Sequence, residues 1–314
     1  MSLEVIEVNG LATLQDPGRV GWRKFGVPTS GAMDSFAFRA ANLLAGNDSN
    51  CAVVEIGLGD VALRALHDCI ISVAGVGYGL SIYIWDFPLW SSYYVRGGWT
   101  IRLDKLDFGM WAYLAISGGV QTPPMLDSRS TYLRGPFGGL DGRQLQVGDV
   151  LRSGTPSHPL NELAARTLPE DARPVYSHHP TLDVIMGPQE NYFTDESIAA
   201  FLSQEYAVSH TSDRMGYRLE GAVLSHRGKT ELISEGMAMG AVQVPSSGQP
   251  IVMMADSPTT GGYPKIGTVV SADLPLLVQC MPNKSKVRFR KTTVAKAQKK
   301  YRELMGGFER IMEE

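Results

Sequence analysis

Short apolar runs separated by glycine and proline recur along the first half of the chain. They are rich in β-branched and aromatic residues, a pattern typical of strands and turns. Five runs predict strands that follow one another at roughly 10-residue spacing, at residues 61–66, 69–73, 80–85, 99–103 and 111–116. This spacing is typical of an all-β sandwich or barrel, so we expect a mainly β fold with a few helices.

One helix is predicted to interrupt the sheet early. Apolar side chains from Phe36 to Leu44 recur at helical spacing over Ser35–Leu44. Asp34 stands where an N-cap would be, and Gly46 follows as a stop signal. The sequence therefore predicts one amphipathic helix against a β-rich first half.

A change of composition between residues 153 and 179 predicts a domain boundary, because prolines gather there around a short helix candidate at 160–166. We expect an N-terminal β-rich domain at residues 1–175 and a second β-rich domain at 176–290. The second begins with a strand at Thr181–Met186 and a helix at Asp195–Ser203. Residues 291–314 predict a charged C-terminal helix, helical over 292–312, that is solvated or serves as an arm for a partner.

Composition narrows the choice of partners and compartment. A formal net charge of -3 over 314 residues gives no attraction to nucleic acid or an anionic membrane. No run of 18 apolar residues predicts a membrane span, and the first residues lack the features of a signal peptide. The three cysteines are far apart, which predicts neither a disulfide framework nor a zinc cluster. We expect a protein of the reducing cytoplasm.

Familiar catalytic motifs are missing from the sequence. The glycines between Gly75 and Gly79 lack the GxGxxG spacing and lie between two predicted strands, so a turn is expected there. No GxxxxGK[ST], GxSxG or HExxH motif occurs. We therefore expect no nucleotide, metal or other cofactor to be bound by this chain alone.

Three loop clusters gather polar and charged residues between glycines and prolines. They contain, in chain order, Gln15, Asp16, Arg19, Ser30 and Asp34; then Arg214; then Gln243, Asp256, Thr260, Gly261, Gly262, Tyr263 and Lys265. Taken singly, each has a structural explanation, since Asp16 and Asp34 suit turns or caps. Taken together, the Arg forks, amide side chains and glycine N–H groups suit a small, planar, carbonyl-containing ligand.

The same clusters carry a family resemblance. The segments at residues 13–19, 26–34, 41–47, 212–219, 240–245, 248–252 and 260–264 match in order and spacing. With them, the chain resembles the KipA-like family, whose members are also called allophanate hydrolase subunit 2 or the C-type subunit of 5-oxoprolinase. This family is related to the carboxyltransferase part of urea carboxylase. The likeness extends over about residues 3–290.

The resemblance implies a cyclophilin-like β-barrel. Because the sequence shows no nucleotide site, we expect the chain to be inactive by itself. The resemblance also implies ATP-dependent opening of 5-oxo-L-proline to L-glutamate together with a KipI-like B-type subunit and an A-type subunit, with ATP and Mg²⁺ used by the assembled complex. Two alternatives stay open. The chain could be a regulatory protein that binds a KipI-like kinase inhibitor, or a biotin-dependent carboxyltransferase component acting on urea or a similar amide. Self-association is also open.

Candidate roles follow from side-chain chemistry. Arg214 is the candidate for the substrate carboxylate, and Arg19, Ser30 and Asp34 are further candidates for substrate binding. Gln15, Gln243 and Thr260, with the backbone N–H groups of Gly261 and Gly262, are candidates for the amide and its oxyanion. Asp16 or Asp256 is a candidate proton acceptor, and Tyr263 or Lys265 a candidate proton donor.

Overall fold

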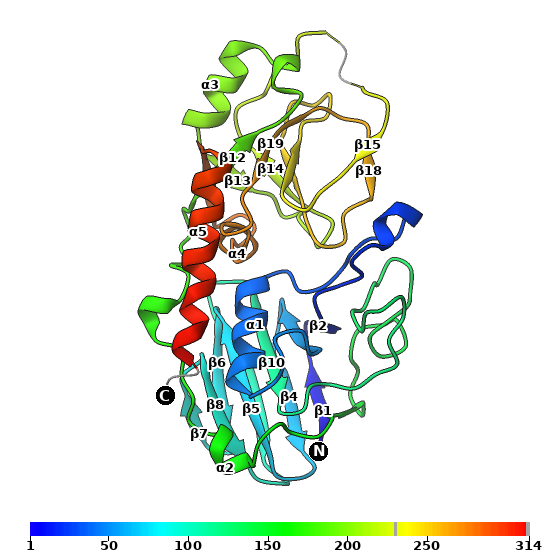
Figure 1. Cartoon of the computed structure of the whole chain (residues 1–314), viewed down its shortest axis with the longest axis vertical. Helices are drawn as coiled ribbons and strands as arrows, with labels where there is room; N and C mark the ends of the chain where they lie inside the picture. Colours follow the sequence, from blue (N-terminus) through cyan, green and yellow to red (C-terminus); the bar gives the residue numbers. More distant parts are fainter. Residues whose placement is uncertain (229–230, 312–314) are drawn as a thin grey trace. The chain divides into compact units, whose positions relative to one another are not determined.

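The structure, a computed structural model, describes residues 1–228 and 231–311, and the fold is mainly β as predicted (Figure 1). The chain divides into two compact units. Unit 1 comprises Met1–Val20, Ser30–Arg173 and the residues from Met305 onward, and unit 2 comprises Gly21–Thr29 and Pro174–Leu304. The main break thus lies between Arg173 and Pro174, whereas the sequence analysis places it after residue 175.

Unit 1 is a sandwich of two antiparallel sheets. The six-stranded sheet has the order β11 (Val150–Arg152), β1 (Ser2–Val8), β4 (Val61–Ala65), β9 (Thr100–Lys105), β6 (Tyr78–Ile82) and β7 (Trp85–Phe87). The five-stranded sheet has the order β2 (Leu11–Gln15), β3 (Val53–Gly57), β10 (Trp111–Ile116), β5 (Cys69–Gly75) and β8 (Ser91–Val95). Alternate side chains of both sheets, such as Leu63 and Ile71, form one buried core.

Strand β5 shows how the helix completes this unit. All its residues are buried, although only one face of a strand can point into the sandwich core. Its other face is covered by α1 (Ser35–Leu44), which packs on β5 and β10 (Figure 1). The predicted helix is confirmed, and the Asp34 carboxylate accepts hydrogen bonds from the N–H groups of Phe36 and Ala37 at 3.1 and 2.9 Å. Such a cap stabilises a helix by about 1 kcal/mol.

The predicted strand at 80–85 is wrong in its extent. Strand β6 ends at Ile82 and β7 begins at Trp85 on the other side of a tight turn. Tyr83 takes the left-handed conformation at φ 59° in that turn. Neither glycine nor proline marks the turn, so the sequence gives it no signal.

Unit 2 is built on the expected barrel, which is closed by seven strands. Their order is β12 (Thr181–Met186), β19 (Lys265–Val269), β16 (Ala241–Gln243), β17 (Ile251–Met253), β14 (Gly216–Glu220), β13 (Tyr206–Val208) and β20 (Lys286–Lys291). Strands β12 and β20 pair in parallel and close the barrel. Helix α3 (Asp195–Ser203) stacks its Phe201 on Phe289 of β20, with ring centroids 4.4 Å apart.

Shorter elements complete the fold. Beside the barrel, β15 (Glu235–Gly236) pairs with β18 (Thr260–Gly261). The short helices are η1 (Trp22–Phe25), α2 (Leu160–Leu163), η2 (Glu170–Ala172), η3 (Glu190–Tyr192) and α4 (Leu274–Val278). The predicted helix at 160–166 is shorter than expected, because the chain turns extended at Ala164.

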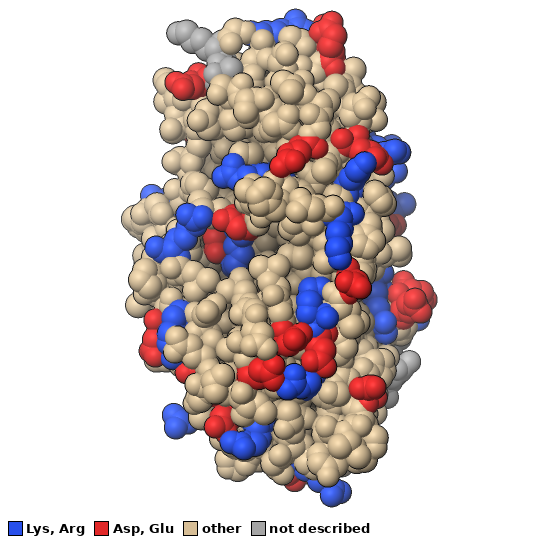
Figure 2. All heavy atoms as spheres, turned by 180° about the vertical axis from the view of Figure 1, so that it is seen from behind, with Lys and Arg blue, Asp and Glu red and all other residues tan. Residues whose placement is uncertain are grey.

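The C-terminal segment is helical over α5 (Val294–Gly306) and η4 (Gly307–Ile311). The last residue of the predicted helix, Met312, lies outside the described residues. Within the described part of the chain, no helix combines the length and apolar character needed to span a bilayer. Figure 2 shows Lys and Arg interspersed with Asp and Glu over one face of the molecule.

Candidate functional site

Asp16 is a buried anchor of the first loop cluster, in unit 1. Its carboxylate accepts hydrogen bonds from the N–H groups of Gly18 and Arg129 at 2.8 and 2.5 Å. The hydroxyls of Ser128 and Ser130 donate to Oδ1 at 2.6 and 2.5 Å. These four donors hold the segment 128–130 against the end of β2. A carboxylate so fully engaged is suited to fixing loop geometry, and its role as proton acceptor stays a prediction.

Gln15 and Ser30 each keep a buried polar atom without a partner among the described residues. Gln15 is fully buried and donates through Nε2 to Thr13 Oγ1 and the Thr131 carbonyl, at 3.0 and 3.2 Å, whereas its Oε1 makes no hydrogen bond. Ser30 is 4% exposed, and its Oγ also makes none. Its backbone takes the left-handed conformation at φ 55°. Unsatisfied buried groups cost free energy, so both are candidates for ligand or water contacts.

A buried polar chain underlies this cluster. The Tyr113 hydroxyl donates to Glu55 Oε2 at 2.8 Å and accepts from the Asp34 N–H at 2.7 Å. Met33 N–H donates to the same Glu55 oxygen at 2.7 Å. Burial, followed by the charge of Glu55, raises the pKa of Tyr113 well above its usual value, so the phenol stays protonated and donates. This arrangement fixes the entry into α1.

Arg19 is also buried in unit 1. Its guanidinium lies 4.6 Å from the centroid of the Phe137 ring, and Nη2 donates to the Ser130 carbonyl. The side chain therefore ties the first cluster to residues 130–137. The structure thus places Gln15, Asp16 and Arg19 around one segment, 128–131, in which Ser128 and Ser130 are functional candidates that sequence reasoning missed.

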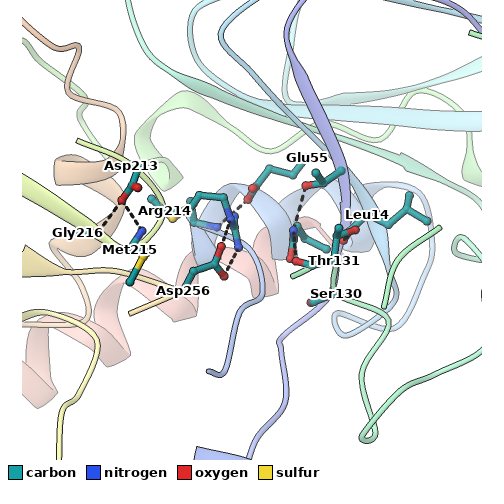
Figure 3. Close-up of polar contacts among 12 residues, drawn as sticks. Leu14, Glu55, Ser130, Thr131, Asp213, Arg214, Met215, Gly216 and Asp256 are labelled. Carbon is teal, nitrogen blue, oxygen red and sulfur yellow. Dashed lines mark hydrogen bonds and ion pairs between the residues drawn. The ribbon is translucent and has the colours of Figure 1, made fainter. Parts of the chain in front are cut away.

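In unit 2, Arg214 and Asp256 form a buried ion pair (Figure 3). Nε and Nη2 of Arg214 donate to Oδ2 and Oδ1 of Asp256 at 2.8 and 3.1 Å, and both side chains are 7% exposed. Beside them Asp213 caps the turn by accepting from the N–H groups of Met215 and Gly216 (Figure 3). A bidentate pair of this kind orients both groups. The substrate-binding role of Arg214 and the proton-acceptor role of Asp256 stay predictions.

Gln243, Gly261 and Tyr263 are brought together beside the barrel. The Gln243 side chain is 5% exposed and donates from Nε2 to the Tyr263 carbonyl at 3.1 Å. A Cβ placed on Gly261 would lie 2.5 Å from that Nε2 and 2.6 Å from Met237 Cε. A larger residue at 261 would therefore require the ends of the Gln243 and Met237 side chains to move. The Tyr263 side chain is 39% exposed.

Lys265 is held in a small polar network. Its Nζ lies 2.8 Å from Glu235 Oε2, which also accepts from Gln189 Nε2 at 2.9 Å. The hydrogen bond and charge of Lys265 lower the pKa of Glu235, which stays ionised. Neither Gln189 nor Glu235 was among the residues predicted from sequence, since each is a lone polar residue outside the three clusters.

The chemistry available to these residues is recognition of amide and carboxylate groups through fixed donors and acceptors. In the described part of the chain, no three His, Cys, Asp or Glu side chains are grouped as a metal site would require. In unit 1, Gln15 Oε1 and Ser30 Oγ have no hydrogen-bond partner among the described residues. In unit 2, taken by itself, the suited groups are the Gln243 amide and the glycine N–H groups at 261–262.

Comparison with known proteins agrees with the predicted resemblance. The family model for the carboxyltransferase domain, subdomain A and B, matches residues 25–291. A protein from Haemophilus influenzae named as the C subunit of 5-oxoprolinase is 38% identical over 88% of this chain and 87% of its own length. Its namesake from Escherichia coli is 34% identical over 98% of this chain and 97% of its own length.

A solved structure extends the comparison to larger proteins. The crystal structure of the K. lactis urea amidolyase matches with a TM-score of 0.92 and 27% identity. The match covers 99% of this chain and 20% of that chain, so this protein corresponds to one part of a much longer relative.

Proposed function

The chain belongs to the family of carboxyltransferase domains of subdomains A and B, and from that premise we propose that it is the C-type subunit of a 5-oxoprolinase. The observation that carries this proposal is the 38% identity to a protein named as the 5-oxoprolinase C subunit, over nearly the whole of both chains. The complex would convert 5-oxo-L-proline, ATP and water to L-glutamate, ADP and phosphate. Its partners would be a KipI-like B-type subunit and an A-type subunit.

A lactam resists opening because its amide is resonance-stabilised and its nitrogen is a poor leaving group. ATP bound with Mg²⁺ elsewhere in the complex would supply the activation of the carbonyl oxygen. This chain would then hold the lactam in place, and orientation of this kind lowers the barrier substantially. Its suited groups are the Gln243 amide and the backbone N–H groups of Gly261 and Gly262, which we assign to the amide and the developing oxyanion.

Reconstitution tests the proposal. The chain is mixed with the A-type and B-type subunits, and glutamate formed from 5-oxo-L-proline is measured with and without ATP. We expect ATP-dependent glutamate formation that is lost when this chain is omitted. As a positive control, the Escherichia coli relative replaces this chain. If that relative supports turnover and this chain does not, the proposal is wrong.

A second candidate is a carboxyltransferase component acting on urea or a similar amide with biotin supplied by another protein. The TM-score of 0.92 to the urea amidolyase favours it. Transfer of a carboxyl group from carboxybiotin to urea by the isolated chain would support this candidate. Absence of transfer under conditions in which an authentic urea carboxylase is active would remove it.

A further inference from the structure

A cavity of about 620 Å³ lies in unit 2 beside the short β15–β18 ladder. Its walls are formed by both arms of that ladder and by the loop that carries η1, and the lining residues used below are Arg23, Lys24, Thr259 and Thr260. Its volume falls within the roughly 300–1,000 Å³ typical of small-molecule sites. Two basic residues and two threonines are thus among the residues that line the cavity, and no acidic residue is among them.

Arg23 is fixed by the backbone at the end of this ladder. Its Nη2 donates to the carbonyl oxygens of Met237 and Pro258, both at 2.7 Å. Met237 follows β15 and Pro258 precedes β18, and the Met237 N–H bonds to the Thr259 carbonyl at 2.9 Å. A single nitrogen of Arg23 therefore bridges the two strands at the end of the ladder. The rest of the planar guanidinium is held in a defined orientation.

The charge of Arg23 is not neutralised within the described residues. No carboxylate there forms an ion pair with it, and Nε and Nη1 have no hydrogen-bond acceptor among the described residues. Partial burial lowers its pKa from the usual value, because burial disfavours the charged form. The guanidinium stays protonated even so, since the arginine pKa is so high. A half-buried cation with spare donors beside a cavity is suited to an anion.

We propose that this cavity binds the carboxylate of a small substrate, with the Arg23 guanidinium as its counter-ion and Lys24, Thr259 and Thr260 beside it. The choice of 5-oxo-L-proline as that substrate rests on the function proposed above. Arg23 takes the role that sequence analysis gave to Arg214, whose guanidinium is engaged by Asp256. The planar guanidinium of Arg23 matches the shape of a carboxylate. Gly261 and Gly262, to which we assign the lactam amide, directly follow Thr260 of the cavity lining, so both parts of the substrate would bind in the same part of unit 2.

The test uses Arg23→Gln and Arg23→Lys in the reconstituted complex. Gln keeps a neutral N–H donor and Lys keeps the charge without the fork. KM for 5-oxo-L-proline is measured from turnover, and its Kd for the complex without ATP is measured by calorimetry. We expect R23Q to raise both by about 10- to 100-fold, and R23K by less, with a smaller change in kcat. Arg218→Gln, which alters an exposed arginine on β14, is the matched control.

Two probes identify the group that is bound. 2-Pyrrolidone carries the lactam without the carboxylate, so its affinity should be the same for wild type and R23Q. Inorganic phosphate should compete weakly. If R23Q leaves both KM and Kd for 5-oxo-L-proline unchanged, or weakens phosphate binding alone, the carboxylate site is refuted.

The results for the site and for the proposed function are separable. A complex without turnover refutes the function, whereas calorimetry of 5-oxo-L-proline with the wild type and R23Q still decides the site. If R23Q fails to fold, Lys24→Gln replaces it, because Lys24 is exposed and its ammonium lies over the ring of Phe25, which is itself exposed. We expect K24Q to raise Kd by about 3-fold through lost attraction to the anion, and an unchanged Kd would refute the site.

Discussion

The ammonium of Lys300 lies 2.6 Å from Oδ1 of Asp273, a carboxylate with no exposed side-chain surface. The same Nζ lies 2.8 Å from Oδ2 of Asp183, whose Oδ1 accepts from Arg290 Nε at 2.7 Å. Two barrel-side carboxylates and two cations thus form one network, and Lys300 brings α5 into it. The network adds a charged attachment for α5, which has half-buried apolar residues such as Tyr301 and Leu304 but no fully buried residue.

Removing Lys300 should destabilise unit 2. Lys300→Met leaves two carboxylates without this counter-ion, and breaking a buried pair is strongly unfavourable. We expect a loss of about 3 kcal/mol in the free energy of unfolding, near the low end for such pairs because Lys300 is 38% exposed. Urea unfolding measures it. The control Lys299→Met alters a neighbour 73% exposed and should change stability by less than about 0.5 kcal/mol. Equal losses in both variants would contradict the prediction.

The same ion pairs predict an alkaline dependence. Burial alone would lower the pKa of Lys300, but its hydrogen bonds to Asp183 and Asp273 outweigh burial and raise it. A group whose pKa is raised in the folded state stabilises the protein fully at pH values below its unfolded pKa of about 10.4. This stabilisation is lost as the pH rises through the folded-state pKa. We expect the difference in unfolding free energy between wild type and K300M to be constant near neutrality and to shrink above about pH 10.4. A difference that grows there would contradict the assignment.

Asp16 should contribute mainly to stability. Asp16→Asn keeps the shape but removes the charge that four donors share, so we expect about 2 kcal/mol of destabilisation in unit 1. Thermal unfolding measures it, and Asp86→Asn on an exposed position of β7 serves as the control. A large loss of turnover in the complex with unchanged stability would instead support the proton-acceptor role predicted from sequence.

The hydroxyl of Tyr113 should contribute about 2 kcal/mol to the free energy of unfolding. Tyr113→Phe fills the same space but leaves Glu55 without one donor and the Asp34 N–H without its acceptor. Denaturant unfolding should show this loss. Tyr83→Phe, in a residue 55% exposed, should change stability by less than about 0.5 kcal/mol. If the two variants are equally stable, the hydrogen bonds of Tyr113 to Glu55 and Asp34 do not contribute to stability.

Gly261→Ala should impair substrate recognition. Its Cβ would lie 2.5 Å from Gln243 Nε2, so the amide must move. We expect kcat/KM of the reconstituted complex to fall about 10-fold or more, since small displacements of positioning groups are costly. Gly262→Ala is the graded comparison, because its Cβ would meet nothing closer than the Leu232 carbonyl oxygen at 3.2 Å. A larger effect at Gly262 than at Gly261 would contradict the steric argument.

Local chemistry explains which elements were predictable. Helix α1 was predicted because a capping aspartate and a helical apolar pattern agree. The predicted helix at Asp195–Ser203 is confirmed as α3, and the structure shows that the Thr194 side chain caps it. The turn between β6 and β7 was missed because Tyr83 adopts a positive φ without a residue type that signals it. Pairing between distant strands, such as β12 with β20, depends on contacts that no local pattern encodes.

The candidate site was predictable only in part, for the same reason. The loop clusters could be found because polar residues and glycines lie close in sequence. Glu55 lies alone within the strand Val53–Gly57, where a charge in an apolar run was the one available signal. Arg23 gives no such signal, because its importance comes from carbonyl groups more than 200 residues away. The roles proposed for the clustered residues stay predictions.

The nine residues Gly21–Thr29 belong to unit 2, although the unit 1 segment Ser30–Arg173 separates them in sequence from the rest of that unit. A gene cut once, at the Arg173–Pro174 break, would give a barrel fragment that lacks Arg23 and its wall of the cavity. Recombination that exchanges a single contiguous segment would likewise separate the arginine from Thr260. During synthesis, too, Arg23 leaves the ribosome long before its carbonyl partners exist. Unit 2 is therefore complete only when residues 21–29 and 174–304 are part of the same chain.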